Sequence, residues 1–127
     1  MENDNVEEVF PGFWHPDVYQ VGFTKMPHEL IQELHKIDSI AELKVILYVM
    51  RHTWGFQEFD QWKRITFEEF MHGRNGLDNG TGLTKQSVIA GLEKAIDHGF
   101  LLCKTIDRDK ARIKKFYKLK LRQESDV

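Results

Sequence analysis

The stretch GLTKQSVIAGLEKAIDHGFL, residues 82–101, constrains the fold most, because it carries signals for both the start and the end of a helix. Thr84 is a residue type that caps helix N-termini, with Ser87 as a weaker alternative. Gly99 suits the left-handed conformation that ends a helix. Apolar residues recur between them at helical spacing. The pattern predicts a helix over residues 85–98 whose core face consists of Val88, Leu92, Ala95 and Ile96.

The outward face of this helix is predicted to be polar and basic, with almost no acid. On or near it fall Lys85, Gln86, Ile89, Ala90 and Lys94. The central glycine of the helix costs roughly 1 kcal/mol relative to alanine, so we expect it to permit a close approach to the short helix that precedes it. One side is therefore expected to pack in a core and the other to meet a partner.

Three further helices are predicted upstream. Pro27 suits the first turn of a helix that runs through Ile37, with Leu30, Ile31 and Leu34 on one side. Ser39 and Glu42 have the spacing of a capping box at the start of a largely buried helix that stops near Gly55. A second capping-box pair, Thr66 and Glu69, begins a short helix with Phe67 and Phe70 pointing inward.

The remaining segments read as a loop and a hairpin. Residues 73–82, GRNGLDNGTG, contain four glycines and forbid regular structure, and we interpret them as a flexible linker that orders on binding. Ile65 reads as a short strand residue. The segments FLLCKTI and IKKFYKLKLR predict two strands of a hairpin joined by the polar turn DRDKAR, with Tyr117, Leu119 and Leu121 inward.

Charge is distributed unevenly, although the net charge is only −2. Residues 1–62 hold four Lys/Arg and eleven Asp/Glu, and residues 63–127 hold fourteen Lys/Arg and nine Asp/Glu. Within residues 85–122, eleven bases stand against four acids. A basic region of this kind favours a polyanion as partner of one face.

The order of these elements predicts a winged helix-turn-helix, mainly α with a small β-hairpin. A chain of 127 residues suits one such domain. We expect an acidic tail over residues 1–17, the winged-helix domain over residues 18–122, and a C-terminal tail over residues 123–127. The helix at residues 85–98 would enter the major groove of duplex DNA, with residues 100–121 as a wing on the backbone.

The stretches FTKMPHELI, AELKVILYVMRHTWGF and GLTKQSVIAGLEKAIDHGFL also resemble a known family. They are similar to the N-terminal origin-binding domain of bacteriophage replication protein O and related replisome organisers, over roughly residues 22–103. RHTWGF is the most specific part, and the ten-residue linker before the last helix departs from a simple turn. The resemblance implies sequence-specific DNA binding at a replication origin, a homodimer, and another replication protein as partner.

The residues expected to contact DNA come from the helix and from the wing. In the helix they are Thr84, Lys85, Gln86, Ser87, Ala90 and Lys94. In the wing they are Arg108, Lys110, Arg112, Lys114 and Lys115. Gln86 could pair with adenine and Lys85 with guanine, while the wing cations would meet phosphates.

Two alternatives share this scaffold: a transcriptional repressor, and an interaction module whose acidic half docks a protein. We expect no enzyme and no cofactor, because no catalytic triad or two-metal acidic cluster is evident. We expect no metal site, since Asp107 and Asp109 belong to a turn and the six histidines lack ligand spacing. One cysteine and the absence of a signal or membrane-spanning pattern predict a cytoplasmic protein.

Overall fold

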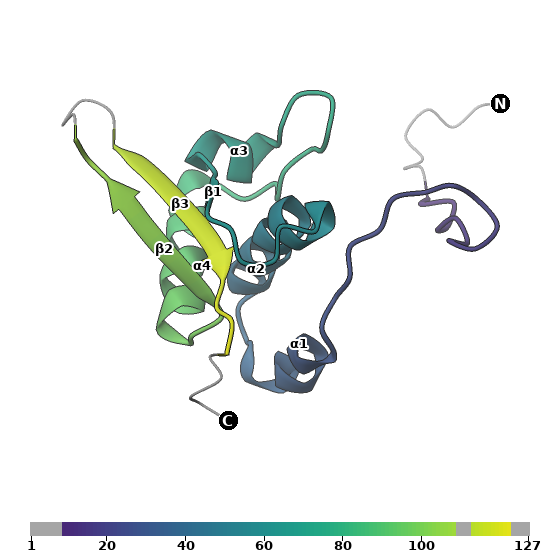
Figure 1. Ribbon diagram of the computed structural model, residues 1–127, viewed down its shortest axis with the longest axis horizontal. Helices are drawn as coiled ribbons and strands as arrows, with labels where there is room; N and C mark the ends of the chain where they lie inside the picture. The colour runs from purple at the N-terminus through teal and green to yellow at the C-terminus, as the bar shows by residue number, and fades with distance from the viewer. Residues whose placement is uncertain (1–8, 109–112, 123–127) are drawn as a thin grey trace, which may run out of the picture.

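The computed structural model describes residues 9–108 and 113–122. Within them it has four α-helices and a three-stranded antiparallel sheet, an α+β arrangement (Figure 1). No helix in these ranges combines the length and apolar character needed to cross a membrane. The elements in chain order are α1 (His28–Glu33), α2 (Ile40–Thr53), β1 (Lys63–Arg64), α3 (Phe67–His72), α4 (Lys85–Asp97), β2 (Leu101–Ile106) and β3 (Lys114–Leu119), with short 3-10 turns at Leu34–Lys36 and Trp54–Phe56.

The sheet has the order β1-β3-β2, so the last strand of the sequence lies in the middle. β2 and β3 form the predicted hairpin, with Leu101 opposite Leu119 and Ile106 opposite Lys114. β1 adds a short third strand, in which Arg64 lies opposite Phe116. The predicted strand residue, Ile65, follows directly and is buried. Figure 1 shows the hairpin extending beyond the helices at its turn end.

The core lies between α2, α4 and the inner face of the sheet. α2 contributes the most buried side chains, and α4 contributes Val88, Leu92 and Ala95. Tyr117 and Leu119 of β3 face the same core as predicted, whereas Leu121 is exposed. Ile96 is also exposed, because it lies at the edge of the apolar stripe of α4.

The capping signals were correct for α3 and α4 and half correct for α2. At α3, Thr66 and Glu69 form the reciprocal capping box. At α2, Ser39 Oγ accepts a hydrogen bond from the Glu42 amide at 3.2 Å, but the Glu42 carboxylate does not return to the cap. It is buried and lies 2.7 Å from Nδ1 of His98, at the end of α4. A tertiary partner has replaced the local one.

Gly91 contacts a different helix from the one we predicted. A Cβ atom at this position would lie 2.6 Å from the carbonyl oxygen of Ala41, in the first turn of α2. The glycine therefore lets α4 approach the backbone of α2, and not α3. This contact brings the two longest helices together at the centre of the fold.

The first helix is shorter than predicted. Pro27 caps α1 from outside, and the helix gives way to a 3-10 turn after Glu33. Leu30 is its one buried residue, while Ile31 is exposed. A short amphipathic turn therefore replaces the longer helix expected through Ile37.

Candidate nucleic-acid interface

The start of α4 is capped as predicted. Thr84 Oγ1 accepts a hydrogen bond from the Ser87 amide at 3.2 Å, and its hydroxyl lies 3.1 Å from Ser87 Oγ. Lys85 and Gln86 follow the cap and are exposed. The first turn carries no acid, and the amide dipoles make this end of the helix positive. The hydrogen bonds between Thr84 and Ser87 thus fix the start of α4, and the side chains of Lys85 and Gln86 are exposed there.

Phe67 joins the start of α4 to the sheet. The Nζ atom of Lys85 lies 5.6 Å from the centre of the Phe67 ring, and the Nζ atom of Lys115 in β3 lies 5.1 Å from it. Both distances are within the range of cation–π attraction. Three elements, α3, α4 and β3, therefore bring two lysines to one place. We call the group Phe67, Lys85, Gln86 and Lys115 the helix–ribbon surface.

The second half of α4 does not belong to this surface. Lys94 Nζ lies 3.8 Å from Asp38, in the segment between α1 and α2. The exposed residues one, two and three turns beyond Gln86 are Ala90, Glu93 and Asp97. The prediction of an outward face with almost no acid was therefore wrong for this half, because Lys94 lies at the flank of the helix and two acids take the exposed centre.

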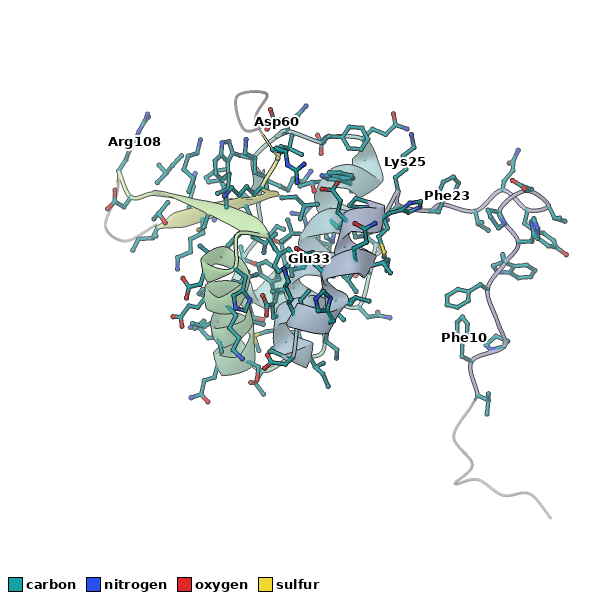
Figure 2. All side chains as sticks on the ribbon, turned by 90° about the horizontal axis from the view of Figure 1, so that it is seen from below. Phe10, Phe23, Lys25, Glu33, Asp60 and Arg108 are labelled. Atoms are coloured by element: carbon teal, nitrogen blue, oxygen red, sulfur yellow. The ribbon has the colours of Figure 1, made fainter. Side chains whose placement is uncertain are left out.

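Lys114 and Lys115 point to opposite faces of the β2–β3 ribbon. Lys115 pairs with Thr105, and Lys114 pairs with Ile106 in the next register position. Successive residues of a strand alternate between faces, so only Lys115 lies on the side of Phe67. The structure thus separates the two wing lysines, and the phosphate contact expected of each stays a prediction. Arg108 is exposed near the turn end of the ribbon (Figure 2), and Lys110 and Arg112 lie outside the described residues.

The outer face of the sheet carries a cluster in which Lys118, expected to point outward, meets Trp62 beside Lys104, two partners that were not predicted. Lys104 and Lys118 have Nζ atoms 5.1 and 4.9 Å from the Trp62 ring centre. Lys118 also pairs with Asp60 at 2.7 Å, and its side chain is only 17% exposed. These lysines cover aromatic surface with their stems. The alternation of the strand could have indicated Lys104 as well, but not the contact of both lysines with Trp62.

The loop at residues 73–82 lacks regular structure, as predicted, but it is attached to the body. Asp78 accepts hydrogen bonds from the Tyr48 hydroxyl at 3.0 Å and the Gly80 amide at 2.9 Å. His52 Nε2 lies 2.8 Å from the other carboxylate oxygen. These contacts replace the flexible linker that we expected, and they fix the path of the chain from α3 into α4.

The protonation of this anchor follows from its surroundings. Burial lowers the pKa of His52 and outweighs the opposing effect of Asp78. Burial alone would raise the pKa of Asp78, but the hydrogen bonds from Gly80, Tyr48 and His52 hold it below its ordinary value. A neutral His52 thus donates its Nε2 proton to an ionised Asp78. The buried Nδ1 has no partner in the described residues.

Metal binding is a second chemistry to consider for the described ranges. They contain no group of three or more His, Cys, Asp or Glu side chains that could hold a metal ion. None of the protein-family models, curated proteins or solved structures with which we compared the chain matches it. The geometry of the helix–ribbon surface is therefore the basis for assigning a function.

Proposed function

We propose that this protein binds duplex DNA in a sequence-specific manner on a winged-helix scaffold, without catalysing a reaction. The order α2–β1–α3–α4–β2–β3 and the strand order β1-β3-β2 suit that scaffold. The observation that carries the proposal is the approach of Lys85 and Lys115 to Phe67. Through these two contacts, α4 and the β2–β3 ribbon each place a lysine on the same side of the molecule.

Base contacts come from the first half of α4 in the major groove. Gln86 is exposed beside the helix start and can bond to both polar groups on the adenine edge. Ala90 is exposed one turn later and can contact a thymine methyl group. Lys85 can reach guanine or a flanking phosphate. Glu93 and Asp97 stay outside the groove, because phosphates repel them.

Phosphate contacts come from the ribbon. Lys115 faces the same side as Lys85, and Arg108 lies near the turn end of the ribbon (Figure 2). We assign Lys110 and Arg112, in the turn, to the same role. These contacts set the register of the helix on DNA and carry no sequence information.

The resemblance to the replication protein O family favours a role at a replication origin in the cytoplasm, with another replication protein as partner. A transcriptional repressor on the same scaffold is the alternative, because the chemistry of binding is the same. Selection of bound fragments from random DNA separates the two. Tandem direct repeats in the enriched site would favour an origin, and an isolated palindrome would favour an operator.

The salt dependence of binding tests the proposal against a protein-binding module. The affinity for a random-sequence duplex should fall steeply with added salt. Lys85→Ala and Lys115→Ala should each reduce the slope of log affinity against log salt by about 0.9. Lys94→Ala is the matched control on the same helix, and it should keep the wild-type slope because Lys94 faces Asp38. A flat response in the wild type would reject DNA binding and favour a protein partner.

A further inference from the structure

An N-terminal arm exposes an unusual amount of apolar surface. Over residues 9–26 five aromatic side chains are exposed, including Phe13 at 94% and Phe23 at 71%. Figures 1 and 2 show this arm running away from the helices and the sheet. Single exposed apolar residues are normal on a protein surface, but a contiguous series of this size marks a contact site. We call residues 9–26 the aromatic arm.

The aromatic arm has local structure of its own. The Phe10 and Phe13 rings lie 4.8 Å apart, and the Trp14 and Tyr19 rings lie 4.7 Å apart. The carbonyl oxygen of His15 accepts hydrogen bonds from the amides of Val18 and Tyr19, both at 3.1 Å, which closes a turn between the second pair. The arm therefore presents two preformed aromatic pairs, which lowers the entropy lost when it docks.

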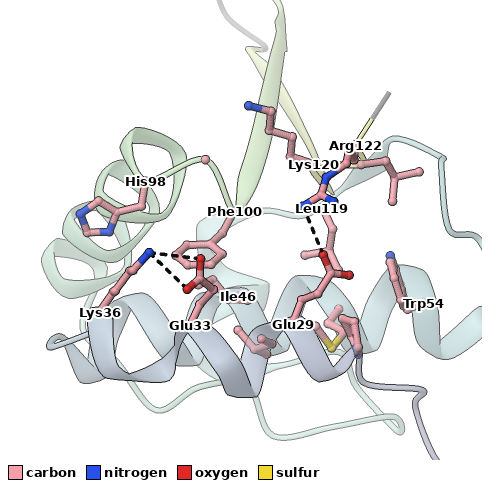
Figure 3. A pocket seen from close by; sticks show the side chains of 15 residues that line it. Glu29, Glu33, Lys36, Ile46, Trp54, His98, Phe100, Leu119, Lys120 and Arg122 are labelled. Atoms are coloured by element: carbon pink, nitrogen blue, oxygen red, sulfur yellow. Dashed lines mark hydrogen bonds and ion pairs between the residues drawn. The ribbon is translucent and has the colours of Figure 1, made fainter. Parts of the chain in front are cut away.

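The body of the protein has a cavity suited to such side chains. It is a half-open pocket of about 560 Å³ between α1, the middle of α2, the turn before β2 and the end of β3. Figure 3 shows apolar residues on its floor, including Ile46 and Phe100, and charged residues on its rim. Glu29 pairs with Arg122 and Glu33 with Lys36 on that rim. The cavity therefore has an apolar interior and a polar border.

One polar atom of the cavity residues lacks a partner. Trp54 stands at one end of the cavity and His98 at the other (Figure 3). The Trp54 indole Nε1 is buried without a hydrogen-bond partner among the described residues. A buried donor of this kind costs free energy until an acceptor reaches it. A docked segment could supply such an acceptor only if the Trp54 ring turns toward the cavity, because the atom has no exposed surface.

We propose that the aromatic arm of one copy docks in this cavity of a second copy, and that the exchange is reciprocal. Each chain carries both the donor and the acceptor, so two copies can close a two-fold dimer without another partner. The root of the arm is attached to the body beside Gly55, since a Cβ atom on Gly55 would lie 2.9 Å from Thr24 Oγ1. Figure 2 shows the chain leaving the body at Phe23.

The contact area is adequate for a stable dimer. Aromatic side chains bury about 150–250 Å² each, so half-burial of five of them covers roughly 400–600 Å² per arm. Counting both surfaces of both contacts gives roughly 1,500–2,500 Å². Stable protein–protein interfaces start at about 1,200 Å².

Sedimentation equilibrium of the full chain tests the dimer. The wild type should be dimeric at micromolar concentration. Phe13→Ser with Trp14→Ser in the arm, or Leu121→Asp on the cavity wall, should weaken dimerisation by roughly 30-fold or more, as expected for the loss of central contacts. Leu77→Ser is the matched control, because Leu77 is an exposed apolar residue of the 73–82 loop outside both surfaces.

Mixing the two variants separates arm exchange from other interfaces. The arm variant keeps an intact cavity and the cavity variant keeps an intact arm, so an equimolar mixture should form a heterodimer with one contact, visible by native mass spectrometry. Urea unfolding should show that the arm variant keeps a folded body. A monomeric wild type, dimers that survive both substitutions, or the absence of a heterodimer in the mixture would each overturn the proposal. DNA binding that depends on Lys85 would persist in a monomeric arm variant, so the two proposals fail separately.

Discussion

The two halves of α4 differ in what surrounds them, although they belong to one helix. In the first half, Lys85 meets Phe67 and Gln86 is exposed without an acid in the same turn. In the second half, Glu93 and Asp97 are exposed and Lys94 faces Asp38. His98, directly after the helix, bonds to the buried Glu42. The first half is thus arranged for contact and the second for attachment to the body.

This difference shows why one description of the outward face for the whole of α4 is misleading. A helical wheel projects all residues of a helix along its axis, so it gives one average charge for the whole outward face. A ligand of the size of a DNA groove meets one end of a helix, so the change of charge along the axis decides what binds. Gly91, in the middle of α4, lets the helix lie against the backbone of α2.

The largest expected effect comes from Gly91→Ala. The substitution improves helix propensity by about 1 kcal/mol, but the added methyl group would lie 2.6 Å from a backbone oxygen that cannot rotate away. We expect the free energy of unfolding, measured with urea, to fall by roughly 3 kcal/mol. The adjacent exposed change Ala90→Gly should cost only about 1 kcal/mol. A stabilised Gly91→Ala protein would show that α2 and α4 are not in close contact.

Gln86→Ala should separate specificity from affinity. If Gln86 reads one adenine, its loss should remove roughly 1–3 kcal/mol of discrimination at one base pair and leave binding to random DNA almost unchanged. Competition between the selected site and single-base variants measures this. Glu93→Ala, in the second half of the helix, is the control and should leave the base preference intact. An unchanged preference in Gln86→Ala would place base reading elsewhere.

Mild acid should weaken the contact between His52 and Asp78, which attaches the 73–82 loop before the first half of α4. Burial lowers the pKa of His52, so below its ordinary value of 6.5 the unfolded chain binds a proton that the folded chain does not. Stability should therefore fall as the pH drops below that value, by up to about 1.4 kcal/mol per pH unit. Asp78, whose pKa lies below 3.8, contributes stability that is lost only at lower pH.

Urea unfolding at several pH values between neutral and mildly acidic measures this effect. The change His52→Gln should flatten the slope, because it removes the group that titrates. The exposed His35→Gln should keep the slope. Equal slopes in all three proteins would show that folding does not change the pKa of His52.

The smallest expected effect comes from replacing the two exposed acids in the second half of α4. Glu93→Gln with Asp97→Asn removes two exposed negative charges, and we expect affinity for random DNA to increase by less than about 1 kcal/mol at low salt. The gain should disappear as salt is raised, because exposed charges are screened. An increase as large as the loss in Lys85→Ala would mean that the whole helix lies along the DNA.

Much of the fold could be predicted because its signals are local. The capping box at Thr66 and Glu69, the cap at Thr84 and the left-handed Gly99 act within a few residues of themselves, and all three are confirmed. The hairpin was predicted from alternation in its second strand. Local hydrogen bonds and strand alternation are readable from a sequence, because neither needs a distant partner.

The errors arose where a distant residue competes with a local one. The side chain of Glu42 could complete its capping box. Its buried carboxylate instead contacts His98, which lies 56 residues further along the chain. Asp78 reads as part of a polar loop until Tyr48 and His52 are known to face it. The candidate surface was partly predicted for the same reason: Lys85 follows from the helix, whereas its convergence with Lys115 depends on Phe67 in a third element.

The central place of β3 in the sheet has a consequence for synthesis. β1 and β2 have no strand between them until residues 114–119 have left the ribosome. A nascent chain that pauses earlier holds helices next to two single strands, whose open edges can pair with neighbouring chains. Pairing with β3 therefore covers one edge of β1 and one edge of β2, while the outer edges of both strands stay open in the finished sheet.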